Sequence, residues 1–145
     1  MERFKLMGAV HLFLFRGGHV LLLRRFNTGY EDGNYSVPAG HLDGGETVTQ
    51  AGIREAREEC GIDIAIQDLS VVGVMHRRSR ADERVDFFLT TTHWTGTIVN
   101  REPDKCDDLS WYALENLPGN TIPYIREALT QHSNGLWFRE FGWDN

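Results

Sequence analysis

The chain has 145 residues, a mass of 16.6 kDa, a net charge of −6 and a pI near 5.4. This length suits one compact domain, so we expect a single domain over residues 1–145. The acidic balance gives no positive surface for a nucleic-acid backbone, so no nucleic-acid polymer is expected as a partner. Two cysteines without CxxC spacing indicate neither a zinc site nor a disulfide framework, which favours a reduced, cytoplasmic setting. No membrane association is expected, because the apolar run near the N-terminus is shorter than the about 20 residues that a span needs.

Two apolar runs near the N-terminus predict a β-hairpin. The expected strands are Leu6–Phe15 and His19–Arg24, and Arg16, Gly17 and Gly18 form the turn between them. A polar loop is expected over Phe26–Asn34.

A helix is predicted over Val48–Cys60. Thr47 and Gln50 have the spacing of a capping box, and Gly61 is a natural stop after the last turn. An apolar stripe at i, i+3 and i+7 faces a sheet, and it consists of Ile53, Ala56 and Cys60.

Four strand-like runs and one more helix account for the rest of the chain. The helix is expected over Ile122–Gln131, with Pro123 in its first turn, where proline is tolerated. The expected strands are Ile62–Ile66, Leu69–Met75, Val85–Trp94 and Leu109–Tyr112. Mixed strands with two helices indicate an α/β sandwich.

Three glutamates share one face of the first helix. Glu55, Glu58 and Glu59 stand at i, i+3 and i+4, so they project a few ångströms apart. Such a run is often only a solvated helix face, but Glu55 and Glu59 repel each other by roughly 0.2 to 0.5 kcal/mol, and Arg54 cannot neutralise three acids. Because Mg²⁺ and Mn²⁺ prefer oxygen ligands, the face predicts a metal and phosphate site, with Mg²⁺ as the expected ion and Mn²⁺ as the alternative.

The order of residues from Gly40 to Ile62 resembles the Nudix box. Gly40 is followed after five residues by Glu46, and after seven more by Arg-Glu-Ala-Arg-Glu-Glu-Cys-Gly-Ile. The resemblance implies the Nudix fold, an α/β/α sandwich with a mixed β-sheet, and an enzyme that hydrolyses a nucleoside diphosphate linked to another group. It also implies that Arg54 orients the glutamates and that Glu46 braces the loop. The implied metal ligands are the backbone carbonyl of Ala39 and the side chains of Glu55, Glu58 and Glu59.

Two residues outside the box are similar to functional residues of MutT-like members. Glu102, eight residues after Trp94, matches a loop glutamate that binds an extra metal or acts as the general base. A surface acid is the alternative interpretation, and a glutamate of the box is the competing base. Arg25 lies fifteen residues before Gly40, where MutT has a phosphate-contacting arginine, while Arg24 points to the other face of its strand.

The candidates for substrate recognition are more scattered. Asn120 resembles a base-reading asparagine, since a carboxamide both donates and accepts, but it equally suits the turn before a helix. Asp107 and Asp108 precede a strand where acids of related enzymes contact the base. Arg84 is a candidate phosphate contact in a basic run that otherwise indicates a solvated loop and includes Arg77, Arg78 and Arg80. Aromatic residues that are candidates for stacking, or by default for packing, are Tyr30, Tyr35, Phe87 and Tyr124.

We therefore expect a metal-dependent pyrophosphohydrolase with a small nucleotide substrate. The favoured substrate is a nucleoside triphosphate, including modified ones such as 8-oxo-dGTP, cleaved to the monophosphate and pyrophosphate. ADP-ribose, a sugar nucleotide or a dinucleoside polyphosphate is the alternative, and the short chain mildly favours the triphosphate. A non-catalytic Nudix module that senses nucleotides is the alternative from another class, although such modules typically lose acids of the box. The resemblance also implies a homodimer as one assembly.

Overall fold

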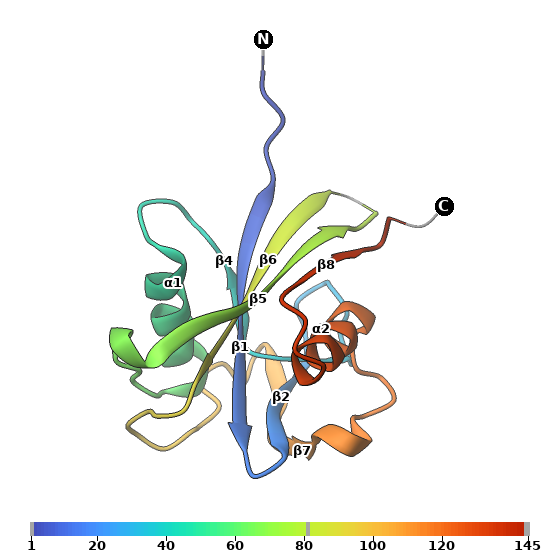
Figure 1. Cartoon of the computed structure of the whole chain (residues 1–145). Coiled ribbons are helices and arrows are strands. Elements are labelled where there is room, and N and C mark those ends of the chain that lie inside the picture. Colours follow the sequence, from blue (N-terminus) through green and yellow to red (C-terminus); the bar gives the residue numbers. More distant parts are fainter. Residues whose placement is uncertain (1, 81, 144–145) are drawn as a thin grey trace.

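A central β-sheet lies between two helices (Figure 1). The computed structural model describes residues 2–80 and 82–143. Helix α1 (Val48–Glu55) covers one side of the sheet and helix α2 (Pro123–Ser133) covers the other. The predicted α/β/α sandwich with a mixed sheet is confirmed. Among the described residues, no helix has the length and apolarity needed to cross a membrane.

The described residues form an eight-stranded sheet with the order β3-β2-β1-β6-β5-β8, to which β4 is added beside β1 and β7 beside β2. The strands are β1 (Met7–Arg16), β2 (His19–Arg25), β3 (Tyr35–Ser36), β4 (Ala39–His41), β5 (Leu69–Arg78), β6 (Glu83–Thr91), β7 (Cys106–Ala113) and β8 (Phe138–Phe141). The pairs β1–β6 and β5–β8 are parallel, and the other pairs are antiparallel. Strand β1 pairs with β6 and β4 and continues into the hairpin with β2, so it links the two halves of the sheet.

The strand predictions are confirmed in part. The N-terminal hairpin forms as expected, and β5, β6 and β7 occupy the expected runs with shifted ends. The prediction of a strand over Ile62–Ile66 is wrong, because this segment makes only an isolated bridge between Asp63 and Thr95. Ile62 and Ile64 are instead buried against the helix layer, so their apolar character reflects packing rather than strand pairing. The short strands β3, β4 and β8 were not predicted.

The glutamate-bearing helix begins where the sequence predicts. The Thr47 hydroxyl accepts a hydrogen bond from the Gln50 backbone, and the Gln50 side chain accepts one from the Thr47 backbone. Regular α1 ends at Glu55, and the last turn, Ala56–Cys60, is π-helical. Gly61 ends the turn in the left-handed conformation, at φ 70°. The predicted span is confirmed, with the addition of a wider turn of the kind often found at functional sites.

Each face of the sheet has its own hydrophobic core. The core under α2 includes Phe13, Phe88 and Ile125, and the core under α1 includes Leu12, Ala56 and Cys60. Burying each large side chain contributes about 1.5–3 kcal/mol, so both helices are firmly held. Two 3₁₀ turns complete the fold, at Ile66–Asp68 and Leu114–Asn116.

Candidate active site

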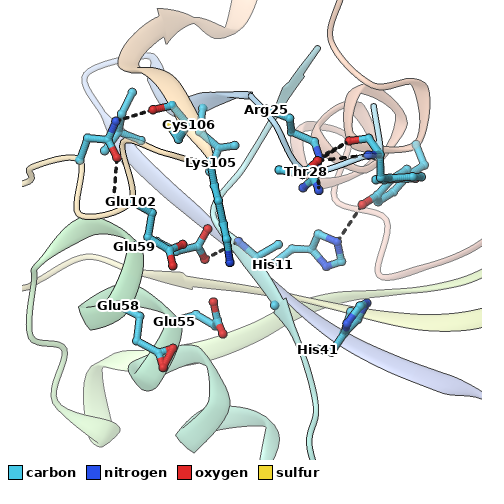
Figure 2. Close-up of a pocket in the computed structure, with 18 of the residues that line it drawn as sticks. His11, Arg25, Thr28, His41, Glu55, Glu58, Glu59, Glu102, Lys105 and Cys106 are labelled. Carbon is cyan, nitrogen blue, oxygen red and sulfur yellow. Dashed lines mark hydrogen bonds between the residues drawn. The ribbon is translucent and has the colours of Figure 1, made fainter. Parts of the chain in front are cut away.

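A cavity of about 600 Å³ opens beside the glutamate-bearing helix (Figure 2). Its lining comes from β1, β2, β4, β5, β6 and β7, from α1 with its π-helical turn, from the first turn of α2, and from the loops that precede β3 and β7. This volume is within the range of sites for nucleotide-sized molecules. The cavity contains all three glutamates of the helix face, Glu55, Glu58 and Glu59.

Gly40 allows Glu55 to reach the cavity wall. Glu55 is only 8% exposed, and its carboxylate packs directly against the Gly40 backbone. A Cβ atom at position 40 would lie 2.2 Å from both Cδ and Oε1 of Glu55. The first residue of the box is therefore a glycine because a carboxylate occupies the space of a side chain.

Arg54 lies among three carboxylates. Its guanidinium donates to Glu46 at 2.7 Å, to Glu55 at 2.6 Å and to Glu58 at 3.2 Å. The hydrogen bond with Glu46 is the largest of the effects that raise the pKa of Arg54, and the same bond lowers the pKa of Glu46. Arg54 thus fixes the positions of two cavity glutamates, and Glu46 fixes Arg54, which is the arrangement that the box resemblance implies.

Glu59 is the most perturbed acid of the cavity. Its carboxylate accepts a hydrogen bond from the Ala39 backbone N–H at 3.0 Å. Burial raises its pKa well above the usual range, and a hydrogen bond with Glu55 and the charges of Glu55 and Glu102 raise it further. These effects favour the neutral form of the Glu59 carboxyl in the metal-free protein, and a cation bound at this wall would favour the carboxylate instead.

The donor set of this wall fits a hard divalent ion. Glu55, Glu58, Glu59 and the Ala39 carbonyl supply only oxygen atoms, as Mg²⁺ and Mn²⁺ prefer. In the described part of the chain, no three acidic, histidine or cysteine side chains already converge on one point that an ion would fill. Arg54 holds Glu55 and Glu58 at the cavity wall, and Glu59 accepts from the Ala39 N–H, so a bound ion would draw these carboxylates closer together.

Positive side chains line other parts of the cavity. Arg25, at the end of β2, donates to the Tyr30 carbonyl at 2.6 Å and lies 5.1 Å from the centroid of the Tyr30 ring. Arg84 lies 3.2 Å from Nε2 of His41 through its Nη1 atom. Arg24 points away from the cavity and pairs with Asp107 at 2.7 Å, as strand alternation predicts. The cavity thus combines acids with cations that suit phosphate oxygens.

The loop before β7 adds Glu102 and Lys105. The Glu102 backbone N–H donates to Asn100 at 3.0 Å, and the Asn100 side chain donates to the Cys106 carbonyl at 2.7 Å, which folds the loop over the cavity. Figure 2 shows Lys105 extending toward the side of the cavity where Glu59 and Glu102 lie. Lys105 was missed in the sequence because a lone lysine in a polar loop has no distinguishing pattern.

Three of the candidate recognition residues are not brought to this cavity. The Asn120 side chain donates to the Gly33 carbonyl at 2.7 Å and so serves the turn before α2. Asp107 pairs with Arg24, and Asp108 accepts from Tyr35 and Ser110, so both acids are engaged outside the cavity although their strand neighbours Arg25 and Cys106 line it. Of the aromatic candidates, Tyr30 and Tyr124 line the cavity, whereas Tyr35 and Phe87 do not.

A buried polar network lies beside the cavity and was not predicted. Arg77 was expected in a solvated loop, but it is 4% exposed and pairs with the fully buried Asp86 through two hydrogen bonds, at 2.7 and 3.2 Å. His11 contacts the Tyr124 hydroxyl at 3.1 Å, and burial lowers its pKa to about 4, so the ring is neutral. The one available signal was a histidine among apolar residues of a strand.

The comparison with protein families agrees with this geometry. A family model described as "NUDIX domain" matches residues 5–132. The NAD-capped RNA hydrolase NudC of Pseudomonas aeruginosa (strain LESB58) is 34% identical over 103 residues, which cover 71% of this chain and 34% of NudC. The chain thus spans about a third of the length of this relative. A Bacillus subtilis (strain 168) protein named "Putative 8-oxo-dGTP diphosphatase" is 27% identical over 128 residues, with 88% of this chain and 80% of that protein covered.

Solved structures show the same fold. The crystal structure of MutT NUDIX hydrolase from Burkholderia pseudomallei aligns with a TM-score of 0.80 and 28% identity, over 88% of this chain and 98% of that one. The MutT protein from Methanosarcina mazei Go1 aligns with a TM-score of 0.77 at 19% identity, over 88% of this chain and 93% of that one, a likeness of fold.

Proposed function

This chain belongs to the Nudix family, and we propose that it is a metal-dependent pyrophosphohydrolase that cleaves a nucleoside triphosphate to the monophosphate and pyrophosphate. One observation carries the proposal, namely that a cavity of about 600 Å³ gathers the three box glutamates and Glu102 together with Arg25, Arg84 and Lys105. A polyphosphate needs both kinds of group, because its negative oxygens must be neutralised and its attacking water must lose a proton.

Glu55, Glu58, Glu59 and the Ala39 carbonyl would hold Mg²⁺, with Mn²⁺ as the substitute. The ion would neutralise charge on phosphate oxygens and lower the pKa of a water molecule. Arg54 keeps Glu55 and Glu58 within reach of the site through its hydrogen bonds to both. Arg25, Arg84 and Lys105 bind the remaining phosphate oxygens from the other sides of the cavity.

Glu102 is our candidate for the general base. It lies in a loop that is held by Asn100, and its charge acts on Glu59, so the two acids are close. Glu102 is not one of the proposed metal ligands of the box, so its carboxylate is available to take a proton from the attacking water at the cavity edge. Glu59 is the competing base.

Two observations bear on the substrate. The relative named as an 8-oxo-dGTP diphosphatase covers most of this chain, which favours a normal or modified nucleoside triphosphate. The relatives named NAD-capped RNA hydrolase NudC favour a different substrate within the class, for which ADP-ribose, a sugar nucleotide or a dinucleoside polyphosphate is the alternative. The single domain over residues 1–145 and the homodimer stay predictions, as do the roles of individual site residues.

The test is hydrolysis of a nucleotide panel that includes normal and oxidised triphosphates, ADP-ribose and NAD. We expect Mg²⁺-dependent cleavage, with mass spectrometry showing monophosphate and pyrophosphate from the best substrate. Glu59→Gln should lower kcat/KM by at least about 100-fold. Glu115→Gln, at an exposed glutamate outside the cavity, is the matched control and should be as active as the parent. Metal-dependent nucleotide binding without hydrolysis would instead indicate a sensing module.

A further inference from the structure

Arg77 is a nearly buried cation in the lining of the cavity. Only 4% of its surface is exposed, and it reaches the cavity from β5. Its guanidinium lies 3.7 Å from the centroid of the Tyr124 ring. Asp86 balances the charge, because its carboxylate oxygens accept from Nε at 2.7 Å and from Nη2 at 3.2 Å. An arginine is almost never buried without such a partner, and here the pairing and the stacking hold the planar group in one position.

One nitrogen of this guanidinium is free to bind a ligand. A guanidinium has five N–H donors, and Asp86 takes up one on Nε and one on Nη2. Nη1 makes no hydrogen bond with any described residue. It is not sealed off either, because the fully buried side-chain polar atoms without a partner in the described chain are His11 Nδ1 and Gln131 Nε2. The surface that Arg77 keeps accessible therefore includes Nη1, and Arg77 borders the cavity.

Arg77 lies at the end of the cavity that is away from the box glutamates. Figure 2 shows His11 on the side of Arg25 and away from Glu58. The Asp86 carboxylate, which binds the Arg77 guanidinium, lies 3.8 Å from Nε2 of His11. Arg77 is thus separated from the proposed metal site and from the phosphates that react there.

The surroundings of Nη1 suit a nucleobase better than a phosphate. Asp86 balances the charge of Arg77, and its carboxylate would repel a phosphate placed beside the guanidinium. Aromatic side chains lie next to this position, because the Tyr124 ring packs against the guanidinium and Tyr30, which is 44% exposed, borders the cavity. The Tyr30 hydroxyl is close enough to act electrostatically on both Arg77 and Tyr124. A base offers flat apolar faces to such rings and acceptor atoms at its edge to the free N–H groups.

We propose that Arg77 is a specificity residue whose Nη1 atom donates a hydrogen bond to an acceptor atom of the substrate's nucleobase, an inference that rests on the proposed function. Asp86 and Tyr124 fix the guanidinium, so the donor is in place before the nucleotide binds. A fixed donor favours a base that has an acceptor at the matching position over a base that has a donor there. Arg77 thus selects the substrate and takes no part in the hydrolysis itself.

The main test compares Arg77→Lys with Arg78→Lys. A lysine at position 77 keeps a positive charge beside Asp86, but its single nitrogen cannot pair with Asp86 and also donate from the position of Nη1. On the best nucleotide we expect Arg77→Lys to lower kcat/KM by about tenfold or more, chiefly through KM. Arg78 is the next residue of β5, is exposed and does not line the cavity, so Arg78→Lys is the matched control and should equal the parent.

A double variant protects the test against misfolding. Arg77→Met together with Asp86→Leu removes both charges of the buried pair at once. Replacing a buried ion pair by apolar side chains of similar size is often neutral or stabilising, so the double variant should fold even if Arg77→Lys does not. It lacks the Nη1 donor as well and should show the same rise in KM. Thermal melting of each variant checks the fold.

A substrate series separates the base from the rest of the nucleotide. On the same sugar polyphosphate without its base, used as a substrate or as a competitive inhibitor, Arg77→Lys and the parent should differ by less than about twofold. Discrimination among the bases should decrease in the variant. Equal losses with and without the base would mean that Arg77 binds the sugar or phosphates or only shapes the cavity, and this would overturn the inference. Parental kinetics in Arg77→Lys and in the double variant would overturn it as well, while the proposed hydrolysis would stand. A parent protein that hydrolyses no nucleotide would overturn both.

Discussion

Substituting alanine for Gly40 tests whether the position of the Glu55 carboxylate matters. The new Cβ would lie 2.2 Å from Cδ and Oε1 of Glu55, whereas ordinary contacts begin at 3.4 Å, so the carboxylate must retreat by roughly 1 Å. Its partner Arg54, at 2.6 Å, must move with it. A displacement of about 1 Å can cost about 100-fold in rate, so we expect kcat/KM to fall by this factor. Stability should fall by only about 1 kcal/mol, because the obstructing atoms end a flexible side chain.

The assay measures Mg²⁺-dependent pyrophosphate release together with thermal melting. Gly119→Ala is the matched control, since a Cβ atom there meets nothing within 4 Å and the residue does not have a positive φ. This control should keep both activity and stability. If Gly40→Ala were as active as the parent and melted normally, the close approach of Glu55 to the backbone would have no functional meaning. A variant that failed to fold would show that the contact supports the structure rather than the reaction.

Three further predictions concern other groups. Burial raises the pKa of Glu59 in the metal-free protein, so the contribution of Glu59 to stability in EDTA should be full below its unfolded pKa of about 4.3 and be lost as the pH rises through the folded pKa. Compared with the parent, Glu59→Gln should lack this loss in melting curves. Asp86→Asn should lower the free energy of unfolding, measured in urea, by about 3–5 kcal/mol, because it leaves the buried Arg77 unpaired. Asp63→Asn, at an exposed ion pair, is the control and should not shift the unfolding midpoint. Burial raises the pKa of the Cys60 thiol, so we expect no reaction of Cys60 with iodoacetamide until urea is added. Peptide mass spectrometry measures the labelling. Rapid labelling of Cys60 in the folded protein would contradict its place in the core.

The glutamate face was predictable because it depends on a single local element. The capping box at Thr47, the stop at Gly61 and the 3.6-residue period require only contacts within one helix, and each was found as expected. The same local logic failed for Ile62–Ile66, because a short apolar run looks the same whether it pairs as a strand or packs under a helix. The π-helical turn was also not predictable, since it has no distinct sequence pattern.

The rest of the cavity lining depends on contacts between distant parts of the chain. His11 and Tyr124 are 113 residues apart, and Asn120 turned toward a loop carbonyl instead of the cavity. Arg77 is buried because the pairing of β5 with β6 brings its side chain within hydrogen-bond distance of Asp86, whose own Cα partner is Met75.

The acidic face of the site was therefore predictable from the spacing of residues close in the sequence, because the backbone geometry of one helix dictates which side chains are neighbours. The residues that line the rest of the cavity are determined by sheet pairing and by the packing of α2, because only the folded chain brings those segments to the same cavity.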